Sequence, residues 1–512
     1  MAATDTDDDH GPFGRPLFDD PSARALSRVG VVDVGSNSVR MVVFDGAARS
    51  PAYFYNEKIM CGLGKGLAET GRLNPEGRRR ALAALKRFSL LAKGMGIETL
   101  TVVATAATRE AEDGPEFQLQ VLRETGLKLW VIDGGEEARL SAQGVLLGWP
   151  EARGIVCDMG GNSMELARIG DGKVGRRVST PLGPFRLQQV ADTPRKRAAH
   201  IDRILKDCQA ELKSEGERIY LVGGSWRVIA RLDMERRNYP LTVLHEYRMT
   251  PKGVLDTLDW IASSDLAVLR ARTGTSSERM ELVPQACEVL RELIAMFKPS
   301  EIDVSAYGIR EGLLYEQMPE RLRQRDPLIE AARMAEQLSS RMPGFGKKLF
   351  DFLEPLFKGV TDERMRLIKA ACLLHDTTWR AHPDYRAEAC FDNATRANLG
   401  GLDHPGRVFL GLALLHRYKN SRAGSRMERL FTLLTEDELQ EAEVLGKALR
   451  FGAMFSVGDP SRAGRLVWQP KKKILELQLT EDGRGLFGEV AQARFTALAL
   501  ALKAATRVET MA

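Results

Sequence analysis

A six-residue pattern, D-x-G-x-N-S, occurs twice in this chain, and the repeat constrains the fold more than any other feature. The paired positions are Asp33, Gly35, Asn37, Ser38 and Asp158, Gly160, Asn162, Ser163. The two aspartates lie 158 − 33 = 125 residues apart, which is the size of a domain. An apolar, β-branched run precedes each aspartate and an extended segment follows each serine. Each copy therefore predicts a strand, a tight turn and a second strand.

These turns have the composition of phosphate-binding loops. Glycines adopt backbone shapes that other residues resist, so successive N–H groups can converge on an anion. Neither copy is followed by a helical pattern, which disfavours a P-loop or a Rossmann fold. An aspartate beside a phosphate is repulsive unless a cation stands between them. Asp33 and Asp158 therefore predict a shared Mg²⁺ (or Mn²⁺) or a cation-bound water. For one copy alone, a plain polar hairpin turn is the alternative.

The composition excludes several classes of protein. No stretch approaches the roughly 18 uncharged apolar residues of a membrane helix, and the N-terminus MAATDTDDDH is acidic where a secretory signal is basic and then apolar. We therefore expect a cytoplasmic protein without a membrane partner. The six cysteines are scattered without a C-x-x-C pair, which predicts neither a zinc site nor a disulfide framework.

Positive charge is concentrated in the C-terminal part of the chain. From Arg321 onward there are 31 Lys and Arg against 24 Asp and Glu, whereas the preceding part has 43 against 45. Two runs, His416–Arg426 and Ser461–Lys473, are predicted to attract a long polyanion by counterion release. The candidate polyanion-binding residues are Arg417, Lys419, Arg422, Lys471, Lys472 and Lys473. A solvated basic surface is the alternative for either run alone.

The pattern of elements predicts four regions. Residues 1–28 are rich in Asp, Pro and Gly and indicate a disordered leader. Strand and helix patterns alternate through residues 29–153 and again through residues 154–318, which indicates two α/β domains. Residues 319–512 change to helical periodicity, with a small extended segment near KILELQLTED.

Six ordered motifs resemble those of the exopolyphosphatase and guanosine pentaphosphate phosphohydrolase family, the Ppx/GppA phosphatases. The motifs are DVGSNSVRMVVFD, ATAATREA, GGEEARLSAQGV, DMGGNSMEL, LVGGSWRVIA and SAYGIREGLLYE. The resemblance implies two ribonuclease-H-like domains of the actin, sugar kinase and Hsp70-chaperone superfamily, which face each other across a phosphate cleft. It also implies a homodimer.

The same resemblance implies roles for individual residues. Glu137, where a strand gives way to a helix, corresponds to the catalytic carboxylate that orients or deprotonates the attacking water. Neighbouring Glu136 would raise the pKa of Glu137 if both side chains pointed into the cleft. Arg109 corresponds to a phosphate clamp. The other implied residues are the phosphate-binding Gly35, Ser36, Asn37, Ser38, Gly160, Gly161, Asn162 and Ser163, the metal ligands Asp33, Asp158 and Glu165, and a nucleoside-type loop of Gly223, Gly224 and Ser225.

The motif LLHD, with His375 and Asp376, resembles the HD-type metal phosphohydrolase fold. That metal site also requires a histidine on a preceding helix of the same domain, and the tail has none before His375. We therefore expect a metal-free, HD-like basic binding region, with a second metal site as the alternative.

Three functions remain open from the sequence. The first is an exopolyphosphatase that removes terminal phosphate from inorganic polyphosphate, and the second is the same hydrolysis of guanosine pentaphosphate. The third is a non-catalytic sensor of alarmone or nucleotide, which the intact Glu137 disfavours. No pattern predicts recognition of a specific nucleic acid.

Overall fold

The computed structural model describes residues 28–45, 49–97, 100–190 and 193–511. Apart from residue 28, the predicted leader lies outside the described residues. The chain divides into two compact units, one ending at Arg325 and the next beginning at Asp326, and each is described by itself.

The first sheet contains the first copy of the repeat. Its strand order is β3-β2-β1-β4-β5, in which β1, β2 and β3 are antiparallel neighbours and β1, β4 and β5 are parallel. The strands are β1 (Gly30–Val34), β2 (Ser38–Phe44), β3 (Tyr53–Met60), β4 (Leu100–Ala104) and β5 (Leu129–Val131). The predicted strand, turn and strand around Asp33 is the β1–β2 hairpin, and Asp33 faces Arg40 across it.

The second sheet repeats this arrangement. Its order is β10-β11-β9-β6-β7-β8, so that β8, β7, β6, β9 and β11 correspond to β3, β2, β1, β4 and β5 in position and direction. The strands are β6 (Gly154–Met159), β7 (Met164–Gly170), β8 (Lys173–Thr180), β9 (Arg218–Gly223), β10 (Tyr247–Met249) and β11 (Ile302–Val304). Asp158 faces Glu165 across the β6–β7 hairpin. The predicted pair of related α/β domains is therefore confirmed.

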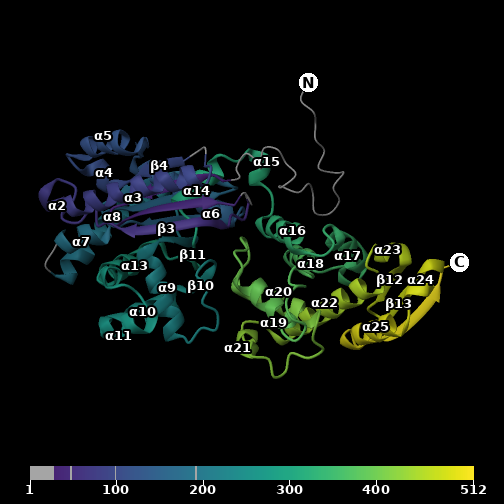
Figure 1. Ribbon diagram of the computed structural model, residues 1–512. Coiled ribbons are helices and arrows are strands. Elements are labelled where there is room, and N and C mark those ends of the chain that lie inside the picture. Colours follow the sequence, from purple (N-terminus) through teal and green to yellow (C-terminus); the bar gives the residue numbers. More distant parts are fainter. Residues whose placement is uncertain (1–27, 46–48, 98–99, 191–192, 512) are drawn as a thin grey trace. The chain divides into compact units, whose positions relative to one another are not determined.

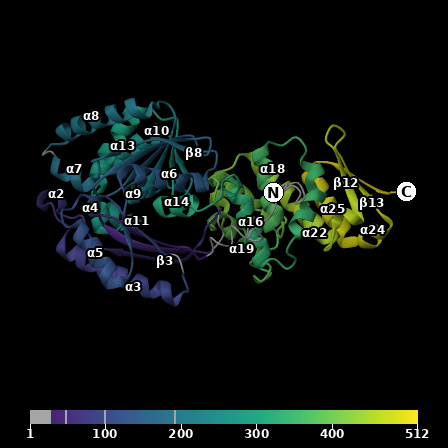
Figure 2. The ribbon, with the colours of Figure 1, turned by 90° about the horizontal axis from the view of Figure 1, so that it is seen from above.

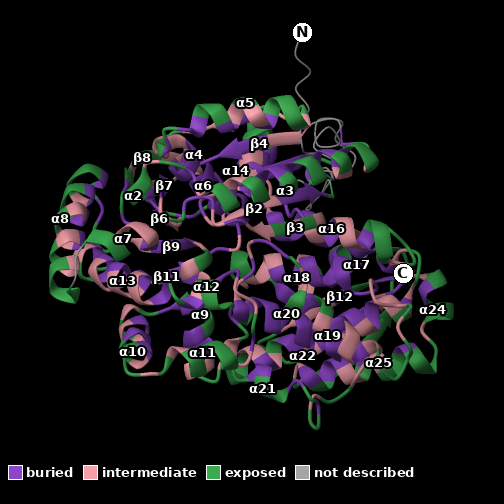
Figure 3. Ribbon diagram, turned by 60° about the vertical axis from the view of Figure 1, so that its left-hand side comes forward, coloured by how far each residue is buried: buried purple, intermediate pink, exposed green. Residues whose placement is uncertain are grey.

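Helices cover both sheets (Figure 1). The helices are α2 (Leu67–Thr70), α3 (Pro75–Gly94), α4 (Ala106–Glu110), α5 (Gly114–Thr125), α6 (Gly134–Gly148), α7 (Pro184–Val190), α8 (Pro194–Leu212), α9 (Gly224–Arg236), α10 (Pro251–Ala262), α11 (Leu266–Thr273), α12 (Ser277–Met280), α13 (Val283–Phe297), α14 (Ile309–Glu316) and α15 (Glu320–Arg323). Figure 3 shows that central strands such as β6 are buried, whereas outer helices such as α5 and α8 carry exposed residues. Apolar cores therefore lie between sheet and helices in both domains.

Two helices cross from one half of the repeat to the other. Helix α6, which follows the first sheet in sequence, packs against β6, β7 and β8, whereas α14, which follows the second sheet, packs against α6 and β1. The two helices lie side by side (Figure 2). Glycines permit this close crossing, because a Cβ at Gly144 would lie 2.2 Å from the carbonyl oxygen of Gly308 and one at Gly312 would lie 1.8 Å from that of Leu140.

The C-terminal unit is mainly helical, as predicted. Its elements are α16 (Pro327–Ser339), α17 (Phe345–Leu353), η3 (Glu354–Phe357), α18 (Asp362–Leu374), α19 (Arg386–Arg396), α20 (His404–His416), α21 (Glu428–Phe431), α22 (Glu436–Phe455), α23 (Pro460–Ala463), β12 (Gly464–Gln469), β13 (Ile474–Leu479), α24 (Glu481–Leu486), α25 (Glu489–Ala501) and β14 (Ala505–Thr510). The predicted extended segment is β13, the central strand of a three-stranded sheet in which β12 is antiparallel and β14 parallel to it. Within the described ranges, no helix combines the length and apolar character needed to cross a bilayer.

Candidate active site

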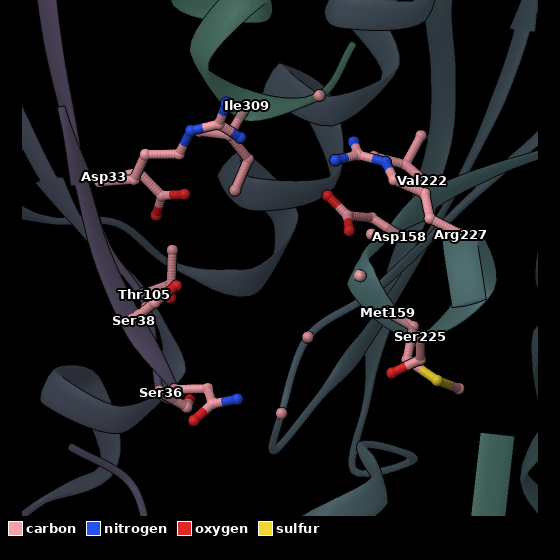
Figure 4. A pocket seen from close by; sticks show the side chains of 18 of the residues that line it. Asp33, Ser36, Ser38, Thr105, Asp158, Met159, Val222, Ser225, Arg227 and Ile309 are labelled. Atoms are coloured by element: carbon pink, nitrogen blue, oxygen red, sulfur yellow. The ribbon is translucent and has the colours of Figure 1, made fainter. Parts of the chain in front are cut away.

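A pocket of about 620 Å³ lies where the two D-x-G-x-N-S hairpins meet. The first hairpin contributes Asp33 and Gly35–Ser38, and the second contributes Asp158–Gly161 and Ser163. The carboxylates of Asp33 and Asp158 face each other across the opening, while Ser36 and Ser38 lie along one wall (Figure 4). The structure therefore brings together the two copies of the repeat that the sequence separates by a whole domain.

The turns themselves are matched. Gly35 donates its backbone N–H to the carbonyl of Ser38 at 3.0 Å, and Gly160 donates to that of Ser163 at the same distance. The two loops also approach each other closely, because a Cβ on Gly161 would lie 3.2 Å from the Cβ of Ser36. Asn162 is buried and is not among the residues that line the pocket.

Positive charge dominates the lining. Its described members include the carboxylates Asp33, Glu137 and Asp158 and the cations Arg40, Lys58, Arg227, Arg231, Arg279 and Arg310. Six cations against three carboxylates favour a polyanionic ligand. Repulsion between these cations also disfavours their protonated forms. Burial, followed by repulsion from Arg279, Arg40 and other arginines, lowers the pKa of Lys58 to about 7.

Glu137 lies in the first turn of α6, which Asp133 caps by accepting the N–H of Glu136 at 2.7 Å. Because α6 packs on the second sheet, the Glu137 side chain is buried near the second hairpin. Burial, Glu165 and Asp158 raise the pKa of Glu137 well above its usual value, and Arg109 opposes the rise. The condition for an effect of Glu136 is not met, because the Glu136 carboxylate accepts hydrogen bonds from Arg139 and does not line the pocket.

Glu165 lies opposite Asp158 in the second hairpin, outside the pocket lining, and is only 1% exposed. One carboxyl oxygen accepts the Ser179 hydroxyl at 2.9 Å, and the other is buried without a hydrogen-bond partner. Burial and the Asp158 charge raise the pKa of Glu165 to about 8. Arg109 contacts Glu137 at 3.2 Å and opposes the rise in its pKa, so this contact favours the negative charge on Glu137.

The predicted metal ligands are not brought together as one set. Among the described residues, no three His, Cys, Asp or Glu side chains are close enough to hold a metal ion, and Glu165 does not line the pocket. Asp33 and Asp158 do line it, and burial raises the pKa of both carboxyls. Mg²⁺ commonly uses one or two carboxylates together with substrate phosphates. The pair Asp33 and Asp158 therefore fits such an ion, and Glu165 does not.

Arg109 occupies a different place from the predicted phosphate clamp. Its Nη1 donates to the Ile132 carbonyl at 2.8 Å and lies 3.2 Å from Glu137 Oε2. It is not among the residues that line the pocket. A guanidinium held in this way orients the Glu137 carboxylate.

The predicted nucleoside-type loop lies at the pocket, where β9 ends and α9 begins. Gly223, Gly224 and Ser225 all line it, and the first turn of α9 also brings in Arg227. Arg227 and Arg310 belong to two of the sequence motifs, LVGGSWRVIA and SAYGIREGLLYE. These motifs could have identified both arginines as candidate site residues. Lys58 and Arg279 carry no comparable sequence signal, because only the fold places them at the pocket.

The predicted polyanion-binding residues of the tail do not form one exposed track. Arg417 is only 7% exposed, which contradicts its assignment to a surface. Lys419 lies 3.4 Å from Glu388, and Arg422 lies 3.8 Å from Glu436 and from Glu443, so acidic neighbours offset both charges. Lys471, Lys472 and Lys473 are exposed in the turn between β12 and β13.

The LLHD motif is occupied by protein groups. His375 Nδ1 lies 2.8 Å from the Cys372 carbonyl oxygen, and Asp376 accepts two hydrogen bonds from the Arg341 guanidinium at 2.8 and 2.5 Å. Both side chains of the motif therefore have protein partners in this structure.

Comparison with known families gives two consecutive matches. Residues 42–321 match the sequence model of the Ppx/GppA phosphatase family, and residues 320–508 match that of the exopolyphosphatase C-terminal region.

Individual relatives agree with these matches. Exopolyphosphatase 1 of Mycobacterium leprae is 28% identical over 56% of this chain and 88% of its own length. Retrograde regulation protein 2 of Saccharomyces cerevisiae is 25% identical over 88% of this chain and 80% of its own length. The crystal structure of the Aquifex aeolicus Ppx/GppA family member has 25% identity and a TM-score of 0.50, and covers 57% of this chain and 97% of that one.

Proposed function

The chain belongs to the Ppx/GppA phosphatase family, and on this basis we propose that it is an exopolyphosphatase that hydrolyses the terminal phosphate of inorganic polyphosphate. One observation carries the proposal. A net cationic pocket between two matched phosphate-type hairpins contains the carboxylate of Glu137, which Arg109 contacts at 3.2 Å. The cations suit a chain of phosphates, and the carboxylate suits the activation of water.

The proposed reaction uses residues of this chain at each point. The hairpin turns, with Ser36, Ser38 and Ser163, hold the oxygens of the terminal phosphoryl group. Glu137 accepts a proton from a water molecule as the water oxygen bonds to phosphorus. The bridging P–O bond breaks in line with the attack, and the shortened polyphosphate leaves with the bond's electrons. Arg109 fixes the Glu137 carboxylate during this transfer.

We further propose that Asp33 and Asp158 hold a Mg²⁺ or Mn²⁺ ion together with substrate phosphate oxygens. Such an ion neutralises phosphoryl charge when bound. Support comes from the two carboxylates that face each other across the pocket. The cytoplasmic location and the homodimer remain predictions.

The test is to incubate the purified chain with long polyphosphate, tripolyphosphate, guanosine pentaphosphate or ATP, and to measure released phosphate with Mg²⁺ or with excess chelator. We expect the highest kcat/KM for polyphosphate and no turnover with chelator. A higher kcat/KM for guanosine pentaphosphate would favour the alternative substrate. Binding without any turnover would favour a sensor.

A further inference from the structure

The HD-like position of the C-terminal unit contains arginines that the proposed reaction does not use. Arg341 lies between α16 and α17, Arg386 begins α19, and Arg417 directly follows α20. Helices α18, α19 and α20 lie side by side in this unit (Figures 1 and 3). The arginines therefore converge from separate parts of the chain.

Arg417 is a buried guanidinium that lacks a carboxylate partner. It is 7% exposed, and its Nε is buried without a hydrogen-bond partner. Among the residues that the structure describes, no carboxylate lies within 4.0 Å of it. Its guanidinium lies 4.9 Å from the centre of the Tyr418 ring. A buried charge without a counter-charge is costly, so this group favours binding of an anion.

Arg386 is a second arginine of the same kind. Its Nε is also buried without a hydrogen-bond partner, and its guanidinium lies 5.7 Å from the Tyr418 ring centre. Its Nη2 donates a 3.3 Å hydrogen bond to the Ala381 carbonyl, which is uncharged. Arg386 and Arg417 thus lie near Tyr418, and each has an Nε–H donor that no protein group accepts.

The acidic group at this position is already engaged. Asp376 is held by Arg341 in a two-point ion pair. Burial lowers the pKa of His375 to about 4, so the imidazole adds no charge. Three arginines against one aspartate leave a net charge of +2. The Arg341 side chain is 51% exposed, which leaves a route from solvent to the cluster.

We propose that Arg417, Arg386 and Arg341 form a binding site for a phosphate group in the C-terminal unit. A phosphate group offers three accepting oxygens and a charge of about −1.5 to −2, which match the spare donors and the net charge. Orthophosphate and a phosphate within polyphosphate share this chemistry. The proposal does not depend on hydrolysis, because orthophosphate binding can be measured without turnover.

The test measures the chemical modification of individual arginines in the full chain. Phenylglyoxal modification, mapped by mass spectrometry, reports Arg341 and Arg386 separately from arginines of the cleft. We expect orthophosphate or long polyphosphate to protect both residues, and not Arg462, whose side chain is 88% exposed in the same unit. Protection by orthophosphate identifies an independent site, whereas protection by polyphosphate alone identifies a site for the substrate chain. Absence of protection by both, or equal protection by polyglutamate, would overturn the proposal.

Two variants and a matched control complete the test. Arg417→Met should raise the phosphate concentration for half-protection of Arg386 by about tenfold or more, since a hydrogen-bonded charge is lost. Arg462→Met should leave it unchanged. In phosphate-free buffer Arg417→Met should melt no lower than the wild type, because it removes an unpaired buried charge. If Arg417→Met does not fold, Arg386→Met replaces it, and the protection of Arg341 against phenylglyoxal is measured instead. Unchanged half-protection in the folded variant would refute the site.

Discussion

The two D-x-G-x-N-S hairpins share a backbone and differ in charge. At the same register position, Arg40 faces Asp33 in the first hairpin and Glu165 faces Asp158 in the second. Burial and repulsion from Arg310 lower the pKa of Arg40 to about 10, whereas burial raises the pKa of Glu165. The comparison teaches that one duplicated backbone carries a cation at one position and a proton-binding carboxyl at the matching position. In the proposed reaction these two groups serve phosphate attraction and proton storage, respectively.

The exchanged helices widen this difference. Helix α6 brings Glu137 to the acidic second hairpin, and α14 brings Arg310 to the first, where its Nη1 lies 3.5 Å from Asp33 Oδ2. Tyr53 donates to Glu311 at 2.7 Å and ties α14 to β3. Glu137 therefore follows the first sheet in sequence but lies at the second, and Arg310 follows the second sheet but lies at the first.

The largest effect is expected at the base. Glu137→Gln should lower kcat about 10²- to 10⁴-fold and leave polyphosphate affinity nearly unchanged, because it removes the proton acceptor and keeps the shape. Single-turnover phosphate release measures the chemical step, and equilibrium binding measures the polyphosphate affinity. Activity within a few-fold of the wild type would show that Glu137 is not the base.

The next effect is expected at the first hairpin. Arg40→Gln should raise KM for polyphosphate about 10- to 100-fold with a smaller change in kcat, because it removes one charge-assisted contact. Arg79→Gln, on a side chain that is 75% exposed, is the matched control and should change neither. A selective loss of kcat would contradict the assignment of binding to the first hairpin.

Much of this frame could be predicted from the sequence. Local periodicity, which is set by a few neighbouring residues, predicts the two hairpins and the helical tail. The repeat of the hairpin predicts the pair of α/β domains. The position of Glu137 came from a family resemblance, since two glutamates at a helix start are otherwise ordinary.

The electrostatics of the site could not be predicted in the same way. Arg109 was expected at phosphate and instead holds Glu137, because only the tertiary fold places the Ile132 carbonyl and the carboxylate together. Glu165 was expected to bind metal, yet a strand position alone does not reveal that it is buried outside the pocket lining. Arg417 lies in a basic run that implied exposure, but its place at the end of α20 buries it.

A smaller, pH-dependent effect is expected at Lys58, which lines the pocket. Its pKa of about 7 means that it loses its charge as the pH rises through neutrality. The wild-type KM for polyphosphate should therefore rise several-fold from about pH 6 to about pH 8, since a charged contact is lost. Lys58→Arg keeps its charge and should flatten this rise. An equally steep rise in Lys58→Arg would assign the pH dependence to another group.

The smallest effect at neutral pH is expected from Glu165→Gln, the matched counterpart of Arg40→Gln in the second hairpin. Glutamine resembles the protonated carboxyl, so kcat should stay within about threefold and the acid limb, which requires ionised Glu137, should not move. The difference appears on the alkaline side. Above the Glu165 pKa of about 8, the wild type places an additional negative charge beneath the phosphates, which raises KM. The variant should lose that inflection. If the inflection near pH 8 persists in Glu165→Gln, the proton does not reside on Glu165, and the proposed division between the hairpins fails on its second side.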